Sequence, residues 1–287
     1  TRLGNTNGQT QFGVNSGMLS TSRIGFKGVE DLGNGLKALF TLEYGLAIDD
    51  NTGIGTGTNI ARQQFVGLTG GFGTVIAGRL QTTGLDFTVA GSALGSSAPL
   101  GATNVATGTG LINGQQLITG LYGRQNNAVA YVSPSFGGVV VAYNHARVSE
   151  LAGTSGNTDA HGDLLSASYA NGPISAGAIY TRVTLDGANN NVKEWGLRAG
   201  YDFGVVKLQA QYQRAKDEAI TTGSDSLWLV SATVPVGAKV AVIGEFGHTS
   251  RKSTTTADNV NAATVAATYS LSKRTTAYAG MKAVRVQ

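Results

Sequence analysis

Residues 193–214 read KEWGLRAGYDFGVVKLQAQYQR, and this stretch decides the fold of the chain. In its first half the apolar residues Trp195, Leu197 and Ala199 alternate with glycine and charged residues. After a Phe-Gly pair at 203–204, apolar residues alternate with lysine and glutamine. Because successive side chains of a strand point to opposite faces, the stretch predicts a β-hairpin with one apolar face and one polar face.

Similar hairpins recur along most of the chain. Tight turns separate the alternating segments, and their Gly and Asn residues supply the positive φ that hairpin turns require. Seven such turns predict fourteen strands of about 8–11 residues, a length typical of strands that cross a membrane. The turns lie at residues 30–35, 69–73, 133–138, 170–173, 201–204, 235–238 and 270–274.

Longer polar loops join one hairpin to the next. In an up-and-down sheet the short turns then gather at one end and the long loops at the other. This asymmetry is typical of outer-membrane barrels and is not required of a sandwich or a propeller. The long loops cover roughly residues 45–61, 80–124, 147–162, 184–192, 215–225 and 249–261.

The apolar rows carry aromatic residues near strand ends, as expected for an interfacial girdle. Two segments, Val139–Tyr143 and Lys239–Ile243, are apolar on both faces, and we expect them to be edge or contact strands covered on both sides. The clearest apolar rows are Ile24 and Phe26; Ala38, Phe40, Leu42 and Tyr44; Leu165, Ala167 and Tyr169; and Ala263, Val265, Ala267, Tyr269 and Leu271.

Composition favours a sheet in lipid. Only 13% of the 287 residues are charged, about half the usual ~25% of globular domains. No run approaches the ~18–20 apolar residues of a membrane helix, and no helix is evident that would cover a soluble sheet. We therefore predict an all-β fold, a transmembrane antiparallel up-and-down β-barrel, as a single domain over residues 1–287. The alternative is a sheet packed on a soluble core.

Several classes of function are disfavoured. The formal net charge is +4, but Lys and Arg are spread singly, so we expect no nucleic-acid partner. Cysteine is absent and His145, His161 and His248 are scattered, so we expect no metal site and no cofactor. The glycines of residues 53–57 are not followed by Lys-Ser/Thr, as a phosphate-binding loop requires. No nucleophile constellation is visible, so we expect no enzyme. No signal peptide is visible.

Short motifs spread over about 250 residues resemble, in order, the general porins of Gram-negative bacteria, particularly the neisserial and betaproteobacterial branch. The resemblance implies a sixteen-stranded barrel in the outer membrane, a homotrimer, and passive diffusion of small hydrophilic solutes. It also implies contact with outer-membrane lipid and lipopolysaccharide. The motifs are STSRIGFKG at 20–28, EDLGNGLK at 30–37, LEY at 42–44, RQQFVGL at 62–68, GFGTV at 71–75, GRL at 78–80, SPSFGG at 133–138 and LSKRT at 271–275.

The two ends of the chain depart from the family pattern. Members begin with a further strand and end with a strand that closes on an aromatic residue, usually Phe. Here residues 1–17 read as a polar loop, and Gln287 stops within or just after a strand. An open sheet would leave two edges unpaired in lipid. We therefore expect about fourteen of the sixteen family strands in this chain, with the first and last strands missing.

Residues 81–123 form the longest loop, which in the family folds inward and makes the pore constriction. From Phe87 to Gly123 it contains no Asp, Glu, Lys or Arg. Its apolar side chains favour packing inside the barrel over full exposure as an external loop. These side chains are Leu94, Leu100, Val105, Leu111, Ile112, Leu117 and Ile118.

By motif position, the family's arginine row opposite that loop corresponds to Arg23, Arg62 and Arg124. Alternation supports Arg23 independently, because Ile24 and Phe26 occupy the apolar face. Glu43 matches a family acid beside the row, and Arg79 and Asp86 lie near the root of the loop. We expect the wider pore to be lined by Lys27, Arg198 and Lys207.

Fixed cations in a narrow pore attract anions, so we predict a channel that prefers anions. We expect the loop 45–61 to hold the neighbouring subunit, as it does in the family. Two alternatives stay open. One is a substrate-specific channel with saturable conductance, and the other is a non-conducting structural or adhesive β protein. A barrel enzyme ranks last.

Overall fold

A computed structural model gives the fold of the chain. It describes residues 2–6, 9–12, 16–51, 53–54, 61–95, 100–101, 104–107, 110–113, 123–149, 160–185, 190–218, 223–250, 252 and 259–286.

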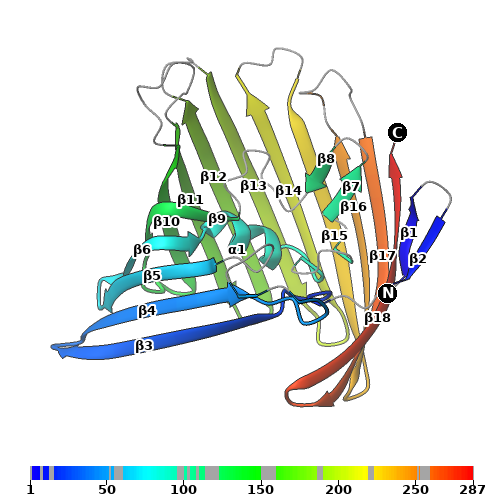
Figure 1. Cartoon of the computed structure of the whole chain (residues 1–287), viewed down its shortest axis with the longest axis horizontal. Coiled ribbons are helices and arrows are strands. Elements are labelled where there is room, and N and C mark those ends of the chain that lie inside the picture. The colour runs from blue at the N-terminus through cyan, green and yellow to red at the C-terminus, as the bar shows by residue number, and fades with distance from the viewer. Residues whose placement is uncertain are drawn as a thin grey trace.

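Within these residues, one antiparallel sheet contains fourteen strands (Figure 1). Each strand pairs with its neighbours in sequence, except that β6 pairs with β9 across the long segment that follows β6. The edge strands are β3 and β18. The strands are β3 (Arg23–Gly33), β4 (Leu36–Gly45), β5 (Ala61–Gly70), β6 (Gly73–Gln81), β9 (Arg124–Val132), β10 (Val139–Ser149), β11 (Ala160–Asn171), β12 (Ile174–Leu185), β13 (Asn190–Asp202), β14 (Lys207–Asp217), β15 (Asp225–Val236), β16 (Val240–Ser250), β17 (Asn259–Ser272) and β18 (Thr275–Val286).

All seven predicted hairpin turns are confirmed, and each joins two neighbouring strands of this sheet. Between β3 and β4, for example, Asn34 and Gly35 both have positive φ, at 52° and 78°, as a two-residue hairpin turn of type I′ requires. The strands are longer than predicted, with 9 to 14 residues. The backbone ladder continues into polar strand ends, because backbone hydrogen bonds do not depend on side-chain polarity.

Several short elements lie outside the large sheet. The hairpin β1 (Arg2–Thr6) and β2 (Gln9–Phe12) occupies a region predicted to be loop. The segment after β6 contains the helix α1 (Thr83–Ala90) and the hairpin of β7 (Asn104–Thr107) and β8 (Gly110–Asn113). No helix is evident from the sequence pattern of this segment. Within the described residues, no helix has both the length and the apolar character needed to span a membrane.

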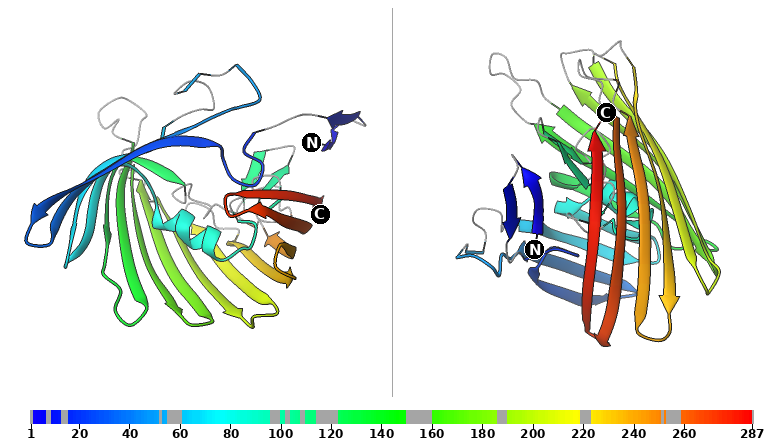
Figure 2. Two further views of the ribbon diagram at one scale, coloured as in Figure 1. Left: turned by 90° about the horizontal axis from the view of Figure 1, so that it is seen from below. Right: turned by 90° about the vertical axis from the view of Figure 1, so that its right-hand side faces the viewer.

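The large sheet curves strongly, and α1 lies on its concave side (Figure 2, left). The two edge strands do not pair with each other, so the sheet is open. On the convex face large apolar side chains are exposed, including Leu197 at 54% and Val265 at 59%. On the concave face polar side chains are buried, including Glu194 at 1% and Gln211 at 4% exposed. The sheet is thus apolar outside and polar inside, as a barrel in lipid requires.

The two segments that are apolar on both faces are expected to be edge or contact strands, and the edge position is wrong for both. Val139–Tyr143 lies in β10 and Lys239–Ile243 lies mostly in β16, and both strands are paired on both sides. Ile243 is covered on the concave side by Leu94 and Leu100. Its apolar character therefore reflects contact with the long segment.

Candidate pore constriction

The segment that follows β6 crosses the concave face of the sheet. We call residues 82–95 with 100–101 the crossing segment. It begins at Thr82, the N-cap of α1, whose side-chain oxygen accepts a hydrogen bond from the Leu85 amide at 3.4 Å. The amide of Thr82 also donates to the carbonyl of Gly123 at 3.0 Å. This bond ties together the two ends of the loop predicted at 81–123.

The helix α1 is anchored on β10, β11 and β12. The amide of Thr83 donates to Oδ1 of Asn144 at 2.7 Å, and the hydroxyl of Thr83 hydrogen-bonds that of Ser166. Phe87 is 3% exposed and packs against Ile179. A Cβ atom at Gly196 would lie 2.8 Å from the ring of Phe87, so glycine on β13 gives the ring its space.

The rest of the crossing segment is anchored on β14 to β18. Side chains of the wall donate to its carbonyl groups, and Glu245 accepts hydrogen bonds from Ser92 and from the Leu94 amide. Leu94 and Leu100 are buried against Ile243 and Ala266. The wall donors are Gln211 to Thr88 at 3.3 Å, Gln209 to Ala90 at 2.9 Å, Thr264 to Leu100 at 2.7 Å and Lys282 to Gly101 at 3.1 Å. The segment therefore spans the concave face from β10 to β18.

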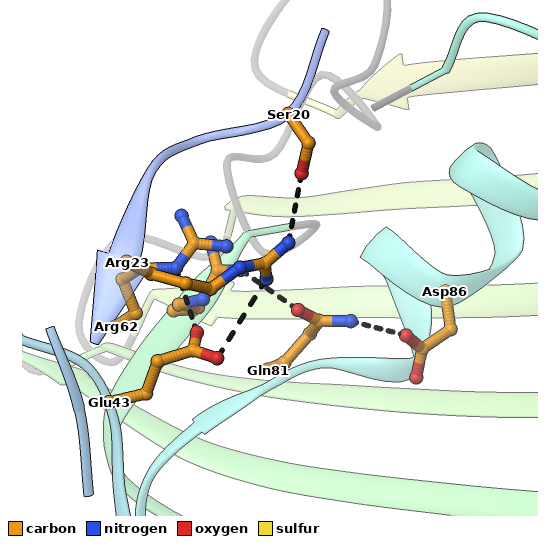
Figure 3. Close-up of polar contacts among 7 residues, drawn as sticks. Ser20, Arg23, Glu43, Arg62, Gln81 and Asp86 are labelled. Carbon is orange, nitrogen blue, oxygen red and sulfur yellow. Dashed lines mark hydrogen bonds and ion pairs between the residues drawn. The ribbon is translucent and has the colours of Figure 1, made fainter. Parts of the chain in front are cut away.

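Three charged side chains from neighbouring strands meet here (Figure 3): Arg23 at the start of β3, Glu43 on β4 and Arg62 on β5. The Nε atom of Arg62 lies 2.8 Å from Oε1 of Glu43, and Nη1 of Arg23 lies 3.7 Å from Oε2. Arg23 also donates to the hydroxyl of Ser20 at 2.8 Å. One carboxylate is therefore shared by two arginines.

A second chain of contacts joins β9 to α1 (Figure 3). Nη2 of Arg124 donates to Oε1 of Gln81 at 2.9 Å, and Nε2 of Gln81 donates to Oδ1 of Asp86 at 2.5 Å. Nearby, Nε of Arg79 donates to the Ala61 carbonyl at 2.6 Å. Gln81 is thus a neutral bridge between a wall arginine and the crossing segment.

Positive charge dominates this region. Arg124 lies within electrostatic range of Arg23, Arg62, Arg79 and Glu43, and Asp86 lies within range of Arg124 and Arg198. The region therefore contains two carboxylates, Glu43 and Asp86, and five arginines, namely Arg23, Arg62, Arg79, Arg124 and Arg198. Although the side chain of Asp86 is exposed to the lumen, the protein around it raises the pKa of its carboxyl group by desolvation.

The structure also places the three residues predicted to line the wider pore. The guanidinium of Arg198 lies over the ring of Phe87, 5.8 Å from its centroid, so Arg198 points to the concave side. Lys207 is exposed and lies on the same face of β14 as Gln209 and Gln211, whose amides reach the crossing segment. Lys27 is exposed and, four residues along β3 from Arg23, lies on the same face of the strand as Arg23. Lys27 and Lys207 thus share the concave face with Arg198 but stand outside the arginine cluster.

Sequence reasoning missed Gln81, Glu245 and Lys282. Gln81 carries no charge, so no electrostatic pattern marked it. Glu245 lies on the concave face of β16 together with Ile243 and Gly247. The alternation of side chains along this strand could therefore have identified it as a residue of the interior. Its partners Ser92 and Leu94 are about 150 positions away in sequence, and no local pattern predicts that contact.

The histidines are less scattered than the sequence suggested. Pairing of β10 with β11 brings the rings of His145 and His161 to 5.8 Å, and Nδ1 of His145 lies 2.9 Å from Oδ1 of Asp163. Within the described residues there is no group of three or more His, Cys, Asp or Glu side chains that could hold a metal ion.

Several parts of the predicted site lie outside the described residues. Leu117 and Ile118 belong to residues 114–122, and most of 52–60, in the loop predicted to hold a neighbouring subunit, is outside as well. Val105, Leu111 and Ile112 lie in β7 and β8, of which only the backbone is described.

A curved antiparallel sheet with an apolar convex face, a polar concave face and a segment crossing inside defines the class of outer-membrane β-barrel channels. The sequence matches the family model described as Gram-negative porin over residues 2–287. The chain therefore belongs to the Gram-negative porin family, as its motifs suggested. It is a protein of the outer membrane, and family and fold are those of a channel rather than an enzyme.

Two relatives illustrate the similarity. Outer membrane porin protein 32 of Delftia acidovorans is 32% identical over 283 residues, which cover 96% of this chain and 77% of that protein. Major outer membrane protein P.IB of Neisseria meningitidis serogroup B is 31% identical over 267 residues, which cover 89% of this chain and 74% of that protein.

Solved structures agree in fold. The anion-selective porin from Comamonas acidovorans superimposes with a TM-score of 0.80 at 28% identity, covering 99% of this chain and 84% of that one. The trimer form of OmpT from Vibrio cholerae gives a TM-score of 0.70 at 15% identity, covering 98% and 84%. The second likeness concerns the fold alone.

Proposed function

We propose that the protein is a passive channel for ions and small hydrophilic solutes that prefers anions. In this proposal the segment 81–123 narrows the pore. Arg23, Arg62 and Arg124 form the positive wall of the narrow part, with Glu43 beside them and with Arg79 and Asp86 at its margin. The excess of arginine over carboxylate in this cluster is the observation that carries the proposal.

The energetic argument is electrostatic. A unit charge ~5 Å from a permeating ion contributes roughly 3 kcal/mol at an effective dielectric constant near 20, and less where water and salt screen it. Several arginines at such distances lower the energy of an anion and raise that of a cation. The segment from Phe87 to Gly123 contains no charged residue that could compensate this field.

A relative supports the sign of the selectivity. The similar structure from Comamonas acidovorans is described as an anion-selective porin. The V. cholerae neighbour has a trimer form, and we propose that this chain also forms a homotrimer, in which the loop 45–61 holds the neighbouring subunit. Its convex face then contacts outer-membrane lipid and lipopolysaccharide.

Reversal potentials in planar bilayers under a potassium chloride gradient test the proposal. The wild-type channel is expected to be anion-selective, and Arg23→Glu and Arg62→Glu are expected to shift the reversal potential toward cation selectivity. Arg274→Glu makes the same charge change in the exposed turn between β17 and β18 and is expected to have no effect. A cation-selective wild-type channel, or equal shifts in all three variants, would refute the proposal.

A further inference from the structure

Two histidines and one aspartate meet on the convex face of β10 and β11. Strand pairing places His145 opposite Asp163, and His161 lies two residues along β11 from Asp163. Leu165, two residues further along β11, is exposed on the convex face. Because residues two apart on a strand share a face, the three side chains lie on the convex face, outside the lumen. We call His145, His161 and Asp163 the histidine cluster.

The histidine cluster lies near the ends of its strands that carry a long loop, which is the external end of such a barrel. Tyr143, Leu165 and Tyr180 are exposed and lie side by side on β10, β11 and β12, as aromatic and apolar residues do at the edge of a membrane-spanning band. His145 and Asp163 lie two residues beyond this row, about 7 Å closer to the loop. Their side chains are 39% and 37% exposed. The cluster is therefore accessible from the external water.

Asp163 holds the ring of His145 in one orientation. Its Oδ1 atom accepts from the hydroxyl of Tyr143 at 2.6 Å and lies 2.9 Å from Nδ1 of His145. Since an ionised carboxylate only accepts hydrogen bonds, Nδ1 carries the hydrogen and Nε2 keeps its lone pair. Histidines that bind metal ions almost always have this arrangement, in which the second ring nitrogen donates to a carboxylate, a carbonyl or a water. His145 is therefore oriented as a metal ligand is.

The distance between the two imidazole rings fits a single bound ion. An imidazole nitrogen lies about 2.0–2.1 Å from a zinc ion, so the centre of its ring lies about 3.2 Å from the ion. Two rings on one ion then have centres between about 4.5 Å apart, for a right angle at the ion, and about 6.4 Å apart, for a straight line. The ring centres of His145 and His161 are 5.8 Å apart. The observed separation lies within the range of a two-histidine site.

The surrounding charges favour a particular class of ion. Strand pairing puts Arg147 beside His161 and Arg182 beside Asp163. These positive side chains disfavour Ca²⁺ and Mg²⁺, which bind oxygen ligands such as carboxylates. Imidazole nitrogen instead suits Cu²⁺, Ni²⁺ and Zn²⁺, and Cu²⁺ binds a given site most tightly of the three. The cluster is therefore suited to a late transition metal ion.

We propose that His145 and His161 bind one divalent late transition metal ion, with Cu²⁺ bound more tightly than Ni²⁺ or Zn²⁺. Asp163 is a positioning residue that orients His145, and water completes the coordination. Two protein ligands are consistent with the lack, within the described residues, of a group of three or more His, Cys, Asp or Glu side chains that could hold a metal ion. The ion joins β10 to β11 on the outside of the barrel, so the inference is independent of the proposed ion selectivity.

The alternative is that the cluster is only a hydrogen-bonded network between two strands. The backbone ladder continues past the cluster to Ser149 and Ala160, so the pairing of the strands does not depend on these side chains. The hydrogen bonds of the Asp163 carboxylate involve Tyr143 and His145. A metal site accounts in addition for the second imidazole beside them.

Electron paramagnetic resonance of bound Cu²⁺ tests the site directly. The full chain has three histidines and no cysteine, so few other side chains compete for the ion. With one equivalent of Cu²⁺ added to the protein in detergent micelles, pulsed spectra count the coordinated imidazoles. The wild type is expected to show two, and both His145→Ala and His161→Ala are expected to lose the two-imidazole signal. A wild-type spectrum with fewer than two imidazoles would overturn the proposal.

His248 supplies a matched control. It lies near the corresponding end of β16, on the same face as the exposed Phe246, and its Nδ1 atom lies 2.8 Å from the neutral Oδ1 of Asn261. His248→Ala removes one imidazole from the convex face and is expected to keep the two-imidazole signal and the affinity for Cu²⁺. Loss of the signal in His248→Ala, or its survival in His145→Ala, would refute the assignment of the ligands.

Asp163→Asn tests the positioning residue. The variant is expected to keep two coordinated imidazoles but to bind Cu²⁺ roughly tenfold more weakly, as the loss of such a carboxylate does at other metal-binding histidines. Asp202→Asn removes an exposed carboxylate from a short turn at the other end of the barrel and is expected to leave the affinity unchanged. Equal affinities of the two variants would exclude an orienting role for Asp163.

Competition tests the class of ion. Excess Zn²⁺ is expected to displace Cu²⁺ from the two-imidazole site, whereas the same concentration of Ca²⁺ is expected to leave the signal unchanged. Displacement by Ca²⁺ at equal concentration would overturn the assignment to transition metals. Reversal potentials of His145→Ala, His161→Ala and Asp163→Asn are expected to match the wild type, because these side chains lie outside the lumen. Failure of the metal site and failure of the selectivity proposal therefore remain distinguishable.

Discussion

The Nε atom of Arg62 lies 2.8 Å from Oε1 of Glu43, although the two residues are 19 positions apart in sequence. In the ladder Glu43 pairs with Gln63 and Tyr44 with Ala61, so Arg62 is the extra residue at a register shift between β4 and β5, and from this bulge its side chain reaches Glu43. Arg23 of β3 approaches the other oxygen of the same carboxylate at 3.7 Å. Glu43 thus partly cancels the field of the arginine cluster and holds two of its members in place.

Glu43→Gln is expected to strengthen anion preference. Loss of one negative charge beside the arginines changes ion energies by roughly 1–2 kcal/mol, which corresponds to about a five- to thirtyfold change in the chloride-to-potassium permeability ratio. Reversal potentials measure this ratio. Glu30→Gln is the control, because Glu30 is exposed near the β3–β4 turn. A fall in anion preference in Glu43→Gln would contradict the assignment.

Asp86 is expected to make selectivity depend on pH. Desolvation raises the pKa of its carboxyl group above the ordinary value, so this group takes up a proton at a higher pH than a free aspartate does. Protonation removes a negative charge from the pore, and anion preference is therefore expected to rise as the pH is lowered from about 7 to about 4. In Asp86→Asn this part of the pH dependence should vanish. Unaltered pH dependence in the variant would exclude Asp86 as its source.

Phe87→Ala is expected to loosen α1 from the wall. Phe87 is buried against Ile179 and under Arg198, and loss of a buried phenyl group costs about 3–5 kcal/mol of packing energy. Single-channel recordings should show a larger and noisier conductance. Phe246→Ala truncates the same side chain on the convex face and should leave conductance unchanged. Identical traces from Phe87→Ala and the wild type would show that α1 does not restrict the pore.

Glu245 is expected to hold the far end of the crossing segment. Glu245→Ala removes the acceptor for Ser92 and the Leu94 amide and leaves these donors unpaired at a cost of about 1–3 kcal/mol. Glu245→Gln keeps an acceptor oxygen of similar shape. Cleavage by proteinase K within residues 91–101 should therefore accelerate in Glu245→Ala and stay slow in Glu245→Gln. Equal cleavage rates in the two variants would argue against this anchor.

Much of the fold was predictable because strands and turns have local signatures. Alternation of apolar and polar residues assigned Leu197 and Glu194 to opposite faces, and Asn34 with Gly35 marked a turn that only such residues form readily. Family motifs also led to Arg23, Arg62 and Arg124, whose roles stay a prediction.

Other features had no local signature. Helix α1 escaped detection because its buried residues, Thr83, Gly84, Phe87 and Thr88, form no apolar stripe of helical period. The anchor at Glu245 and the approach of His145 to His161 depend on strand pairing and on contacts between distant segments. The predicted edge position of the strand that contains Ile243 was wrong for a similar reason. This strand is apolar on its concave face because Leu94 and Leu100 of the crossing segment pack on it there.

The sequence by itself determined the number of strands in the large sheet, the position of their turns, the face on which most strand side chains lie and the lack of charge from Phe87 to Gly123. These properties follow from backbone and side-chain preferences over a few neighbouring residues. Only the tertiary structure decided that one carboxylate, Glu43, serves two arginines, and that the crossing segment reaches β18 through Leu100 and Gly101. Such contacts depend on strand register and on the curvature of the whole sheet, which distant residues set together.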